Sequence, residues 1–321
     1  MGQSAILLAS LLGPNGTRQA GRVNAQGLLL LGRQGATYYV DETDGDDTQA
    51  NAGGPFSPFA TLAAANAVAV AGDTIYIVGT VHVSATVVFS QNNLQVIGLN
   101  APSNNCRARI SQTGSTVFSP LVSVTGQGCR FENLGTFHGF ADASAQVCWA
   151  DSGGRNYYEN VDFMGGGNAT AAAQAGCRSL VLSGSTGENY FKNCGIGLDT
   201  VARATNSNAT LEMSGASPRN TFDRCRFQML SSLAGNFHVL VGSGGIDRWA
   251  EFIGCRFYNA VNSTGTTITA DFSVHASAGG ACVLDPTCIS YGATKISAAG
   301  PVIVGGVVPT AGTSSLGVTA S

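Results

Sequence analysis

Residues 221–227 read Thr-Phe-Asp-Arg-Cys-Arg-Phe, and related stretches stand at 190–196 and 251–257. In five successive segments, 27 to 33 residues apart, an aromatic residue stands three places before a cysteine or an aliphatic residue. The pairs are Phe131 with Leu134, Tyr158 with Val161, Phe191 with Cys194, Phe222 with Cys225, and Phe252 with Cys255. Self-similarity at such a period is the signature of a repeat architecture, so the chain is expected to form a solenoid.

A second motif keeps the same period. A Ser-Gly or Thr-Gly pair follows a short apolar stretch at 125–126, 152–153, 183–184, 214–215 and 243–244. Each repeat is therefore interpreted as one coil of short strands, in which every strand stacks about 4.8 Å from its equivalent in the next coil. The glycine of each pair is expected to adopt the left-handed backbone that a corner requires.

The repeat length favours a parallel β-helix, an all-β fold. About 30 residues hold three short strands with their loops, whereas a β-propeller blade needs about 40 residues and four strands. The alternation of side chains places the aromatic columns inside the coil. The positions expected at turns or on the outer face are Asn133, Asn160, Asn193 and Arg224. A further interior residue follows each Leu- or Cys-type position two places later, at Phe163, Ile196, Phe227 and Phe257, with the first copy displaced to Phe137.

The composition favours a fold of many short strands and argues against nucleic acid or a membrane as a partner. Of the 321 residues, 44% are hydrophobic, only 11% are charged and 43 are glycine, which suits tight turns around a real core and argues against disorder. The net charge is -3 without a basic run, so nucleic acid is not expected as a partner. Since the chain holds no block of about 18 apolar residues, no membrane span is expected either.

The nine cysteines are expected to be free and buried. An odd number leaves at least one unpaired, and the chain contains no Cys-x-x-Cys pair of the kind that binds zinc or performs thioredoxin chemistry. A buried free thiol behaves as a small hydrophobic group. Cys194, Cys225 and Cys255 are predicted to fill one interior column, one strand spacing apart.

The region that precedes the repeats resembles the opening of pectate-lyase-like right-handed β-helix proteins. The resemblance is carried by Tyr38-Tyr39-Val40-Asp41, Gly45-Asp46-Asp47, the stretch 53–62 and the stretch 71–77. Similar openings occur in polysaccharide lyases and hydrolases, in surface proteins and in phage structural proteins, so the resemblance implies a fold more strongly than an activity. Within it, residues 60–70 are predicted to form a short helix that caps the first coil, because Pro58 precedes them and Gly72 follows.

These elements divide the chain into three parts. Residues 1–36 are interpreted as an N-terminal arm or attachment segment, 37–290 as the parallel β-helix, and 291–321 as a C-terminal arm. The last segment is almost uncharged and apolar, so it is expected to pack on a partner or a sister subunit.

Three groups of polar residues are candidates for a catalytic or metal site. Glu132, Glu159 and Asp223 share the column after the aromatic residue, together with Lys192 and Ile253, and stacked acids could form a hydrolytic pair or a solvated ladder. The acidic stretch 41–47 could bind calcium, but an Asx-rich turn is favoured because its spacing does not match an EF-hand. The histidines are isolated. We therefore assign no catalytic, cofactor-binding or metal-ligating residue from the sequence, and no cofactor.

The functional expectation rests on the resemblance to phage β-helix proteins. The favoured hypothesis is a non-enzymatic structural protein of a bacteriophage virion, a capsid decoration, cement or head-fibre-like protein, or a tail appendage. It would assemble as a homotrimer and dock onto other virion proteins through residues 1–36 and 291–321. The alternative is a tailspike-type polysaccharide depolymerase or lyase on the same fold, and a third hypothesis is a bacterial surface adhesin.

Overall fold

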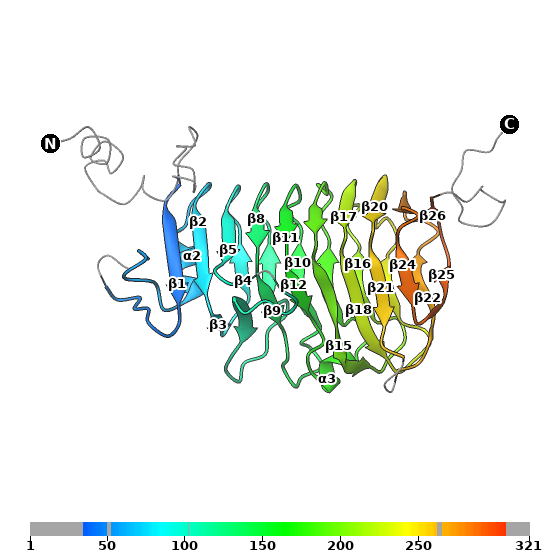
Figure 1. The fold of residues 1–321 in the computed structure, drawn as a ribbon, viewed down its shortest axis with the longest axis horizontal. Coiled ribbons are helices and arrows are strands. Elements are labelled where there is room, and N and C mark those ends of the chain that lie inside the picture. The colour runs from blue at the N-terminus through cyan, green and yellow to red at the C-terminus, as the bar shows by residue number, and fades with distance from the viewer. Residues whose placement is uncertain (1–34, 50–52, 102, 262–264, 306–321) are drawn as a thin grey trace.

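The computed structural model describes residues 35–49, 53–101, 103–261 and 265–305, and the fold is a right-handed parallel β-helix (Figure 1). The chain coils through three parallel sheets, and each strand pairs with its equivalent in the coils before and after it. The all-β solenoid expected from the repeat is confirmed.

Sheet 1 contains ten strands and is the longest of the three. In spatial order its strands are β1 (Thr37–Asp41), β2 (Thr74–Val78), β5 (Gln95–Gly98), β8 (Arg130–Glu132), β11 (Tyr157–Glu159), β14 (Tyr190–Lys192), β17 (Asn220–Asp223), β20 (Trp249–Ile253), β23 (Ala281–Leu284) and β26 (Val302–Val304).

Sheet 2 and sheet 3 contain eight strands each. Sheet 2 consists of β4 (Val87–Phe89), β7 (Val122–Val124), β10 (Val147–Asp151), β13 (Arg178–Leu182), β16 (Ala209–Met213), β19 (Phe237–Val241), β22 (Ile268–Val274) and β25 (Ala293–Ser297). Sheet 3 consists of β3 (Thr80–Val83), β6 (Arg109–Gln112), β9 (Gly135–Phe137), β12 (Asp162–Met164), β15 (Gly195–Arg203), β18 (Arg226–Ser231), β21 (Arg256–Asn259) and β24 (Ile289–Tyr291).

The predicted interior columns are confirmed by the strand register. In sheet 1, Phe131, Tyr158, Phe191, Phe222 and Phe252 are successive partners, and all five are fully buried. The expected interior position of Phe137 is wrong. Thr136, not Phe137, holds the interior position beside Phe163 in sheet 3, whereas Phe137 pairs with Met164 on the outer side. The interior threonine hydroxyl accepts a hydrogen bond from Cys148, which compensates for burying it.

The sharp turn between sheet 1 and sheet 3 uses a left-handed residue in every coil of the repeat. Asn133, Asn160 and Asn193 each have φ 53°, and Arg224 has φ 52°. Asparagine tolerates this region because its side chain bonds locally, so the turn positions expected from the sequence are confirmed.

The glycines of the Ser/Thr-Gly pairs have a different role from the one expected. Gly153, Gly184 and Gly215 do not have a left-handed φ, but a Cβ at each would collide with a backbone carbonyl of the preceding coil. Close approach between coils, rather than a positive φ, therefore requires glycine here. In the last pair Gly244 does have φ +63°, and Gly245 makes the close approach instead.

The predicted N-terminal helix is confirmed as α2 (Leu62–Val68). The Thr61 side chain caps it by accepting from the backbone N–H of Ala64, at 3.1 Å. Leu62 and Ala65 are buried and join the core of the solenoid at the N-terminal end in Figure 1. The second described helix, α3 (Ala169–Ala172), lies in the connection between sheets 3 and 2.

The boundaries of the solenoid differ from the expected ones at the C-terminal side. β25 and β26 pair with β22 and β23, so the coil continues to Val304 and includes the first part of the expected arm 291–321. Residues 1–34 and 306–321, which hold most of the two expected arms, lie outside the described residues.

An asparagine ladder, which the sequence reading did not identify, links coils inside the solenoid. Asn156 Oδ1 accepts from the N–H of Cys129 at 2.8 Å, Asn189 Oδ1 from the N–H of Asn156 at 2.9 Å, and Asn220 Oδ1 from the N–H of Asn189 at 3.2 Å. All three asparagines are buried. Each side chain therefore satisfies a backbone donor of the coil before it.

Candidate functional site

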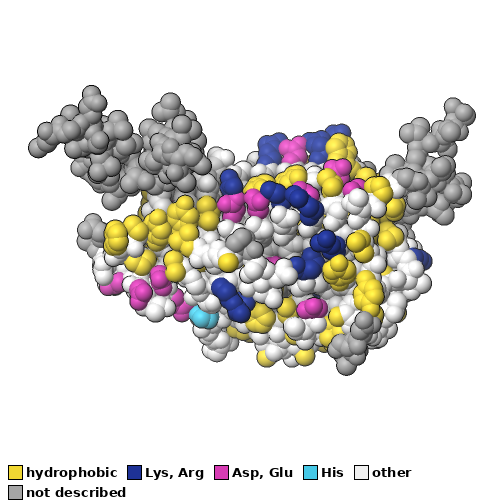
Figure 2. Space-filling model, viewed as in Figure 1, with side chains coloured by type: hydrophobic (Ala, Val, Ile, Leu, Met, Phe, Trp, Pro, Cys, Tyr) yellow, Lys and Arg dark blue, Asp and Glu magenta, His cyan; other side chains and the backbone are white. Residues whose placement is uncertain are grey.

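The acidic column proposed from the sequence does form on the outer face of sheet 1. Glu132, Glu159, Lys192, Asp223 and Ile253 are successive register partners. Because parallel strands stack without offset, residues with the same position in the repeat meet on one face. Figure 2 shows magenta and dark-blue side chains gathered along this face.

Each carboxylate of this column already has a partner. Arg130 Nε donates to Glu132 at 2.7 Å, and Lys192 Nζ donates to Glu159 at 2.7 Å. The Tyr157 hydroxyl also donates to Glu159, at 2.7 Å.

Asp223, the third acid, has one charged and one hydroxyl partner. Arg224 Nε lies 3.1 Å from one of its oxygens, and the Tyr190 hydroxyl donates to the other at 3.2 Å. The column is therefore a ladder of neutralised pairs.

The pKa of Glu159 opposes general-acid chemistry at this residue. The hydrogen bond from Lys192, followed by that from Tyr157, holds the pKa of Glu159 below its ordinary value. A hydrolytic pair needs one carboxyl group that keeps its proton near neutral pH, through a raised pKa. Glu159 has the opposite shift, so the ladder favours the structural interpretation over the hydrolytic one.

A pocket of about 510 Å³ lies on the outer face of sheet 3, beside the left-handed turn. We call it the arginine pocket. It is lined by Ser103, Asn104, Asn160, Asp162, Asn193, Cys194, Arg224, Arg226, Arg256 and Tyr258. This site was not predicted from the sequence. A pattern that indicates it is present, because Asp162, Arg226 and Arg256 each directly precede an interior phenylalanine of the repeat.

Asp162 and Arg226 form the centre of the arginine pocket. Their closest atoms, Oδ1 and Nη2, lie 3.5 Å apart, and Asp162 Oδ2 accepts from the N–H of Cys106 at 3.1 Å. Arg226 also donates to Asn104 at 2.6 Å and to Gln228 at 2.6 Å. Burial raises the pKa of Asp162, and the Cys106 N–H and Arg226 offset part of that rise.

Glycine makes the Asp162–Arg226 contact possible across an intervening strand. In sheet 3, Gly195 is the register partner of both residues. A Cβ on Gly195 would collide with the Asp162 carboxylate and come within 2.8 Å of Arg226 Nη2. The arginine can cross to Asp162 only because this position lacks a side chain.

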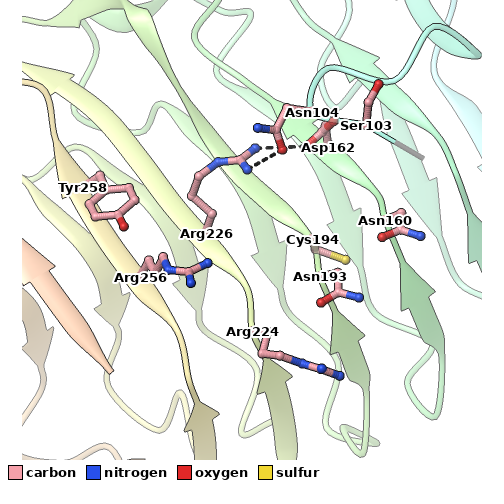
Figure 3. A pocket seen from close by; sticks show the side chains of 10 residues that line it. All are labelled: Ser103, Asn104, Asn160, Asp162, Asn193, Cys194, Arg224, Arg226, Arg256 and Tyr258. Carbon is pink, nitrogen blue, oxygen red and sulfur yellow. Dashed lines mark hydrogen bonds and ion pairs between the residues drawn. The ribbon is translucent and has the colours of Figure 1, made fainter. Parts of the chain in front are cut away.

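Arg256 and Tyr258, both from β21, line the arginine pocket beside Arg226 (Figure 3). Arg226 and Arg256 are register partners, so their side chains leave neighbouring strands on the same face. Dashed lines join Arg226 to Asn104 and Asp162, while none reaches Arg256. Within the described part of the chain, the Arg256 guanidinium has no hydrogen bond or ion pair.

The acidic stretch 41–47 serves the local backbone, as the favoured interpretation expected. Asp41 accepts from the N–H of Thr43 at 3.0 Å, which is an Asx turn. Asp47 accepts from the N–H of Ala60 at 2.8 Å and from the hydroxyl of Thr61 at 2.7 Å, just before α2. Among the described residues, no group of three or more His, Cys, Asp or Glu side chains could hold a metal ion.

Two histidines that look isolated in the sequence pair with carboxylates. His82 Nδ1 lies 2.9 Å from Glu42 at the surface. His238 Nδ1 lies 2.8 Å from Asp271, and both side chains are completely buried. The second pair has no access to solvent, so it belongs to the core rather than to a site.

All the cysteines except Cys288 are buried as predicted, and Cys288 is half-buried. Cys194, Cys225 and Cys255 are buried in consecutive coils, and all nine cysteines are free. Burial raises the pKa of Cys129 to about 11 and that of Cys148 to about 12. Such thiols are unreactive as nucleophiles near neutral pH.

Comparisons with known proteins agree on the fold. No protein-family model and no curated protein matches the chain. Among solved structures, it is similar to pectin methylesterase from Aspergillus niger, with 13% identity over 89% of this chain and 91% of that one, and a TM-score of 0.52. A mutant pectin methylesterase in complex with a hexasaccharide gives 13% identity, 87% and 92% coverage, and a TM-score of 0.53. At this identity the likeness shows the right-handed parallel β-helix alone.

No helix in the described part of the chain is long and apolar enough to cross a membrane.

Proposed function

We propose that this chain is a non-enzymatic structural protein of a bacteriophage virion, a capsid decoration, cement or head-fibre-like protein. One observation carries the non-enzymatic part of the proposal. The three carboxylates that the repeat stacks on the outer face of sheet 1 are each paired with an arginine or a lysine, and the described lining of the arginine pocket contains a single carboxylate, Asp162. Neither place offers two unpaired carboxyl groups side by side, as glycoside hydrolysis requires.

The architecture suits a mechanical role. Three continuous parallel sheets, filled with stacked aromatic rings, make a stiff element whose length is set by the number of coils. The assignment to a virion is supported by the overall resemblance of a capped, weakly charged β-helix to phage β-helix proteins, and not by the opening stretch or by the solved neighbours.

The C-terminal end of the solenoid supports docking. β24, β25 and β26 are the last strands of the three sheets, and no described strand pairs with their outer edges. All three residues of β24 are exposed. Since unpaired edges template association with another chain, this end is the favoured place for a partner or for the subunits of a homotrimer.

The docking proposal is tested by truncation outside the described strands. Deleting residues 1–34 or 306–321 leaves every described strand, from β1 to β26, in the chain. We expect each truncated chain to keep the far-ultraviolet spectrum of the full chain and to lose cosedimentation with virus particles that lack the protein. If both truncated chains still cosediment as the full chain does, docking through the terminal segments is excluded. Light scattering of the full chain tests the homotrimer.

A second candidate, a tailspike-type or related polysaccharide-modifying enzyme, is favoured by a different observation. The similar solved structures are pectin methylesterases. In this chain the pKa of Asp162 is raised, and its carboxylate lies next to Arg226 in a pocket. An enzyme of this kind would release reducing ends, unsaturated sugars or methanol from a polysaccharide.

A further inference from the structure

The arginine pocket has more positive charge than its own carboxylate balances. Arg226 is paired with Asp162, and Arg224 is paired with Asp223 just outside. Arg256 also lines the cavity and has no partner among the described residues. One guanidinium thus lines the cavity with donors that no described residue occupies. A guanidinium is the side chain best suited to bind a carboxylate, through two parallel hydrogen bonds.

An aromatic surface adjoins the free arginine. Tyr258 follows Arg256 by two residues, so both point outward from β21, and Tyr291 is its register partner on β24. Tyr291 is 45% exposed. Tyrosine presents an apolar face and a polar hydroxyl, which suits a ligand with both apolar and hydroxyl-bearing surfaces.

The remaining lining supplies hydrogen-bonding groups without further charge. Asn160 and Asn193 stand one coil apart at the left-handed turn, and Ser103 faces them from the loop that precedes β6. Amide and hydroxyl groups can donate to and accept from sugar hydroxyls. A small inorganic anion would use the arginines alone and would leave the tyrosines and asparagines without a role.

We propose that the arginine pocket binds an acidic oligosaccharide, with a sugar carboxylate on Arg256, a sugar ring on Tyr258 and hydroxyl groups on the asparagines of the turn. The site is a binding site and not a catalytic one. It extends the structural role by a glycan-recognition surface on the side of the rod. Binding of the oligosaccharide does not require attachment to a virion. A failure to bind the oligosaccharide and a failure to dock onto the virion are therefore separate outcomes.

The test is calorimetric titration of the purified full chain with defined hexamers. The acidic probes are oligogalacturonate, oligomannuronate and oligosialate, and the neutral control is maltohexaose. We expect at least one acidic hexamer to bind, more weakly at high salt because exposed charges are screened, and maltohexaose not to bind.

Matched variants locate the binding. Arg256→Ala should weaken the affinity for the acidic hexamer by about ten-fold or more, as expected for loss of a charge-assisted bidentate contact. Tyr258→Ala should weaken it as well. The control is Arg248→Ala, because Arg248 is an exposed arginine paired with Asp247 outside the pocket, and it should leave the affinity unchanged. Circular dichroism confirms that all variants fold.

Four outcomes would overturn the proposal. They are the binding of none of the three acidic hexamers, equal binding of maltohexaose, an unchanged affinity in Arg256→Ala, and competition by inorganic sulfate as strong as that of the hexamer itself. The last result would identify a simple anion site.

Discussion

Phe191 and Phe222 stack face to face from adjacent coils, with ring centroids 4.7 Å apart and planes 8° apart. The same relationship continues to Phe252, at 4.9 Å and 9°, and back to Tyr158, at 4.5 Å and 4°. The spacing of the ring centroids is close to the spacing of the strands, so the rings repeat from coil to coil with the same pitch as the backbone. The aromatic stack therefore fixes the register of the coils from inside.

The centre of this stack should be costly to remove. Phe222→Ala leaves a cavity between two rings that the backbone ladders keep from collapsing, so we expect the free energy of unfolding to fall by about 3–5 kcal/mol. Urea denaturation measures the change. The control is Trp249→Ala on the same sheet, where 43% of the side chain is exposed and a loss of less than about 1 kcal/mol is expected. Equal losses in the two variants would show that the stack is not the core.

The interior asparagine ladder gives a second prediction. Asn189→Ala removes the acceptor of the Asn156 N–H and leaves that buried donor unpaired, which should cost about 1–3 kcal/mol in the free energy of unfolding. Gln127→Ala, which shortens an exposed amide side chain, is the control and should change little. If Asn189→Ala unfolds at the same urea concentration as the wild type, the ladder does not contribute to stability.

The buried thiols should not react with a labelling reagent in the native protein. Because burial raises the pKa of Cys129 to about 11 and of Cys148 to about 12, both stay protonated at pH 8. In spite of its burial, hydrogen bonds from Cys225 and Cys288 lower the pKa of Cys255, but its side chain is out of reach of the reagent. Eight cysteines are buried and Cys288 is half-buried, so labelling at pH 8 should modify at most that one. Full labelling of all nine should require guanidinium. Rapid modification of several cysteines in the folded chain would contradict the interior columns.

The repeat was predictable because its period depends on residues that must be apolar in every coil. Phe191, Phe222 and Phe252 each lie at an interior place that water cannot reach, so the pattern in the sequence records the pitch of the coil directly. The capping helix was predictable for the same kind of reason, since Pro58 and Gly72 delimit an apolar stretch.

The arginine pocket could not be assembled from the repeat alone. Asn104 comes from the loop before β6 and reaches Arg226 across 122 residues of sequence. No period predicts where such a loop folds. The role of Gly195 was equally hidden, because a glycine in a strand does not reveal which side chains cross over it.

The sequence was also silent about which acids are neutralised. Glu132, Glu159 and Asp223 were correctly placed in one column, but their partners come from positions two residues before, one coil after and one residue after, respectively. Which neighbour each carboxylate reaches depends on the twist of the sheet and on side-chain packing. The hydrolytic interpretation could therefore be weighed only with the structure.

The central claim, that the outer carboxylates of the solenoid stabilise structure and do not catalyse, is tested most directly by product analysis. The purified chain is incubated for a prolonged period with polygalacturonate, methyl-esterified pectin and the capsular polysaccharide of the host, and the mixture is analysed by chromatography for reducing ends, unsaturated sugars and methanol. We predict none of these products above a control without protein. A product that appears with the wild type and disappears with Asp162→Asn or Glu159→Gln would contradict the account.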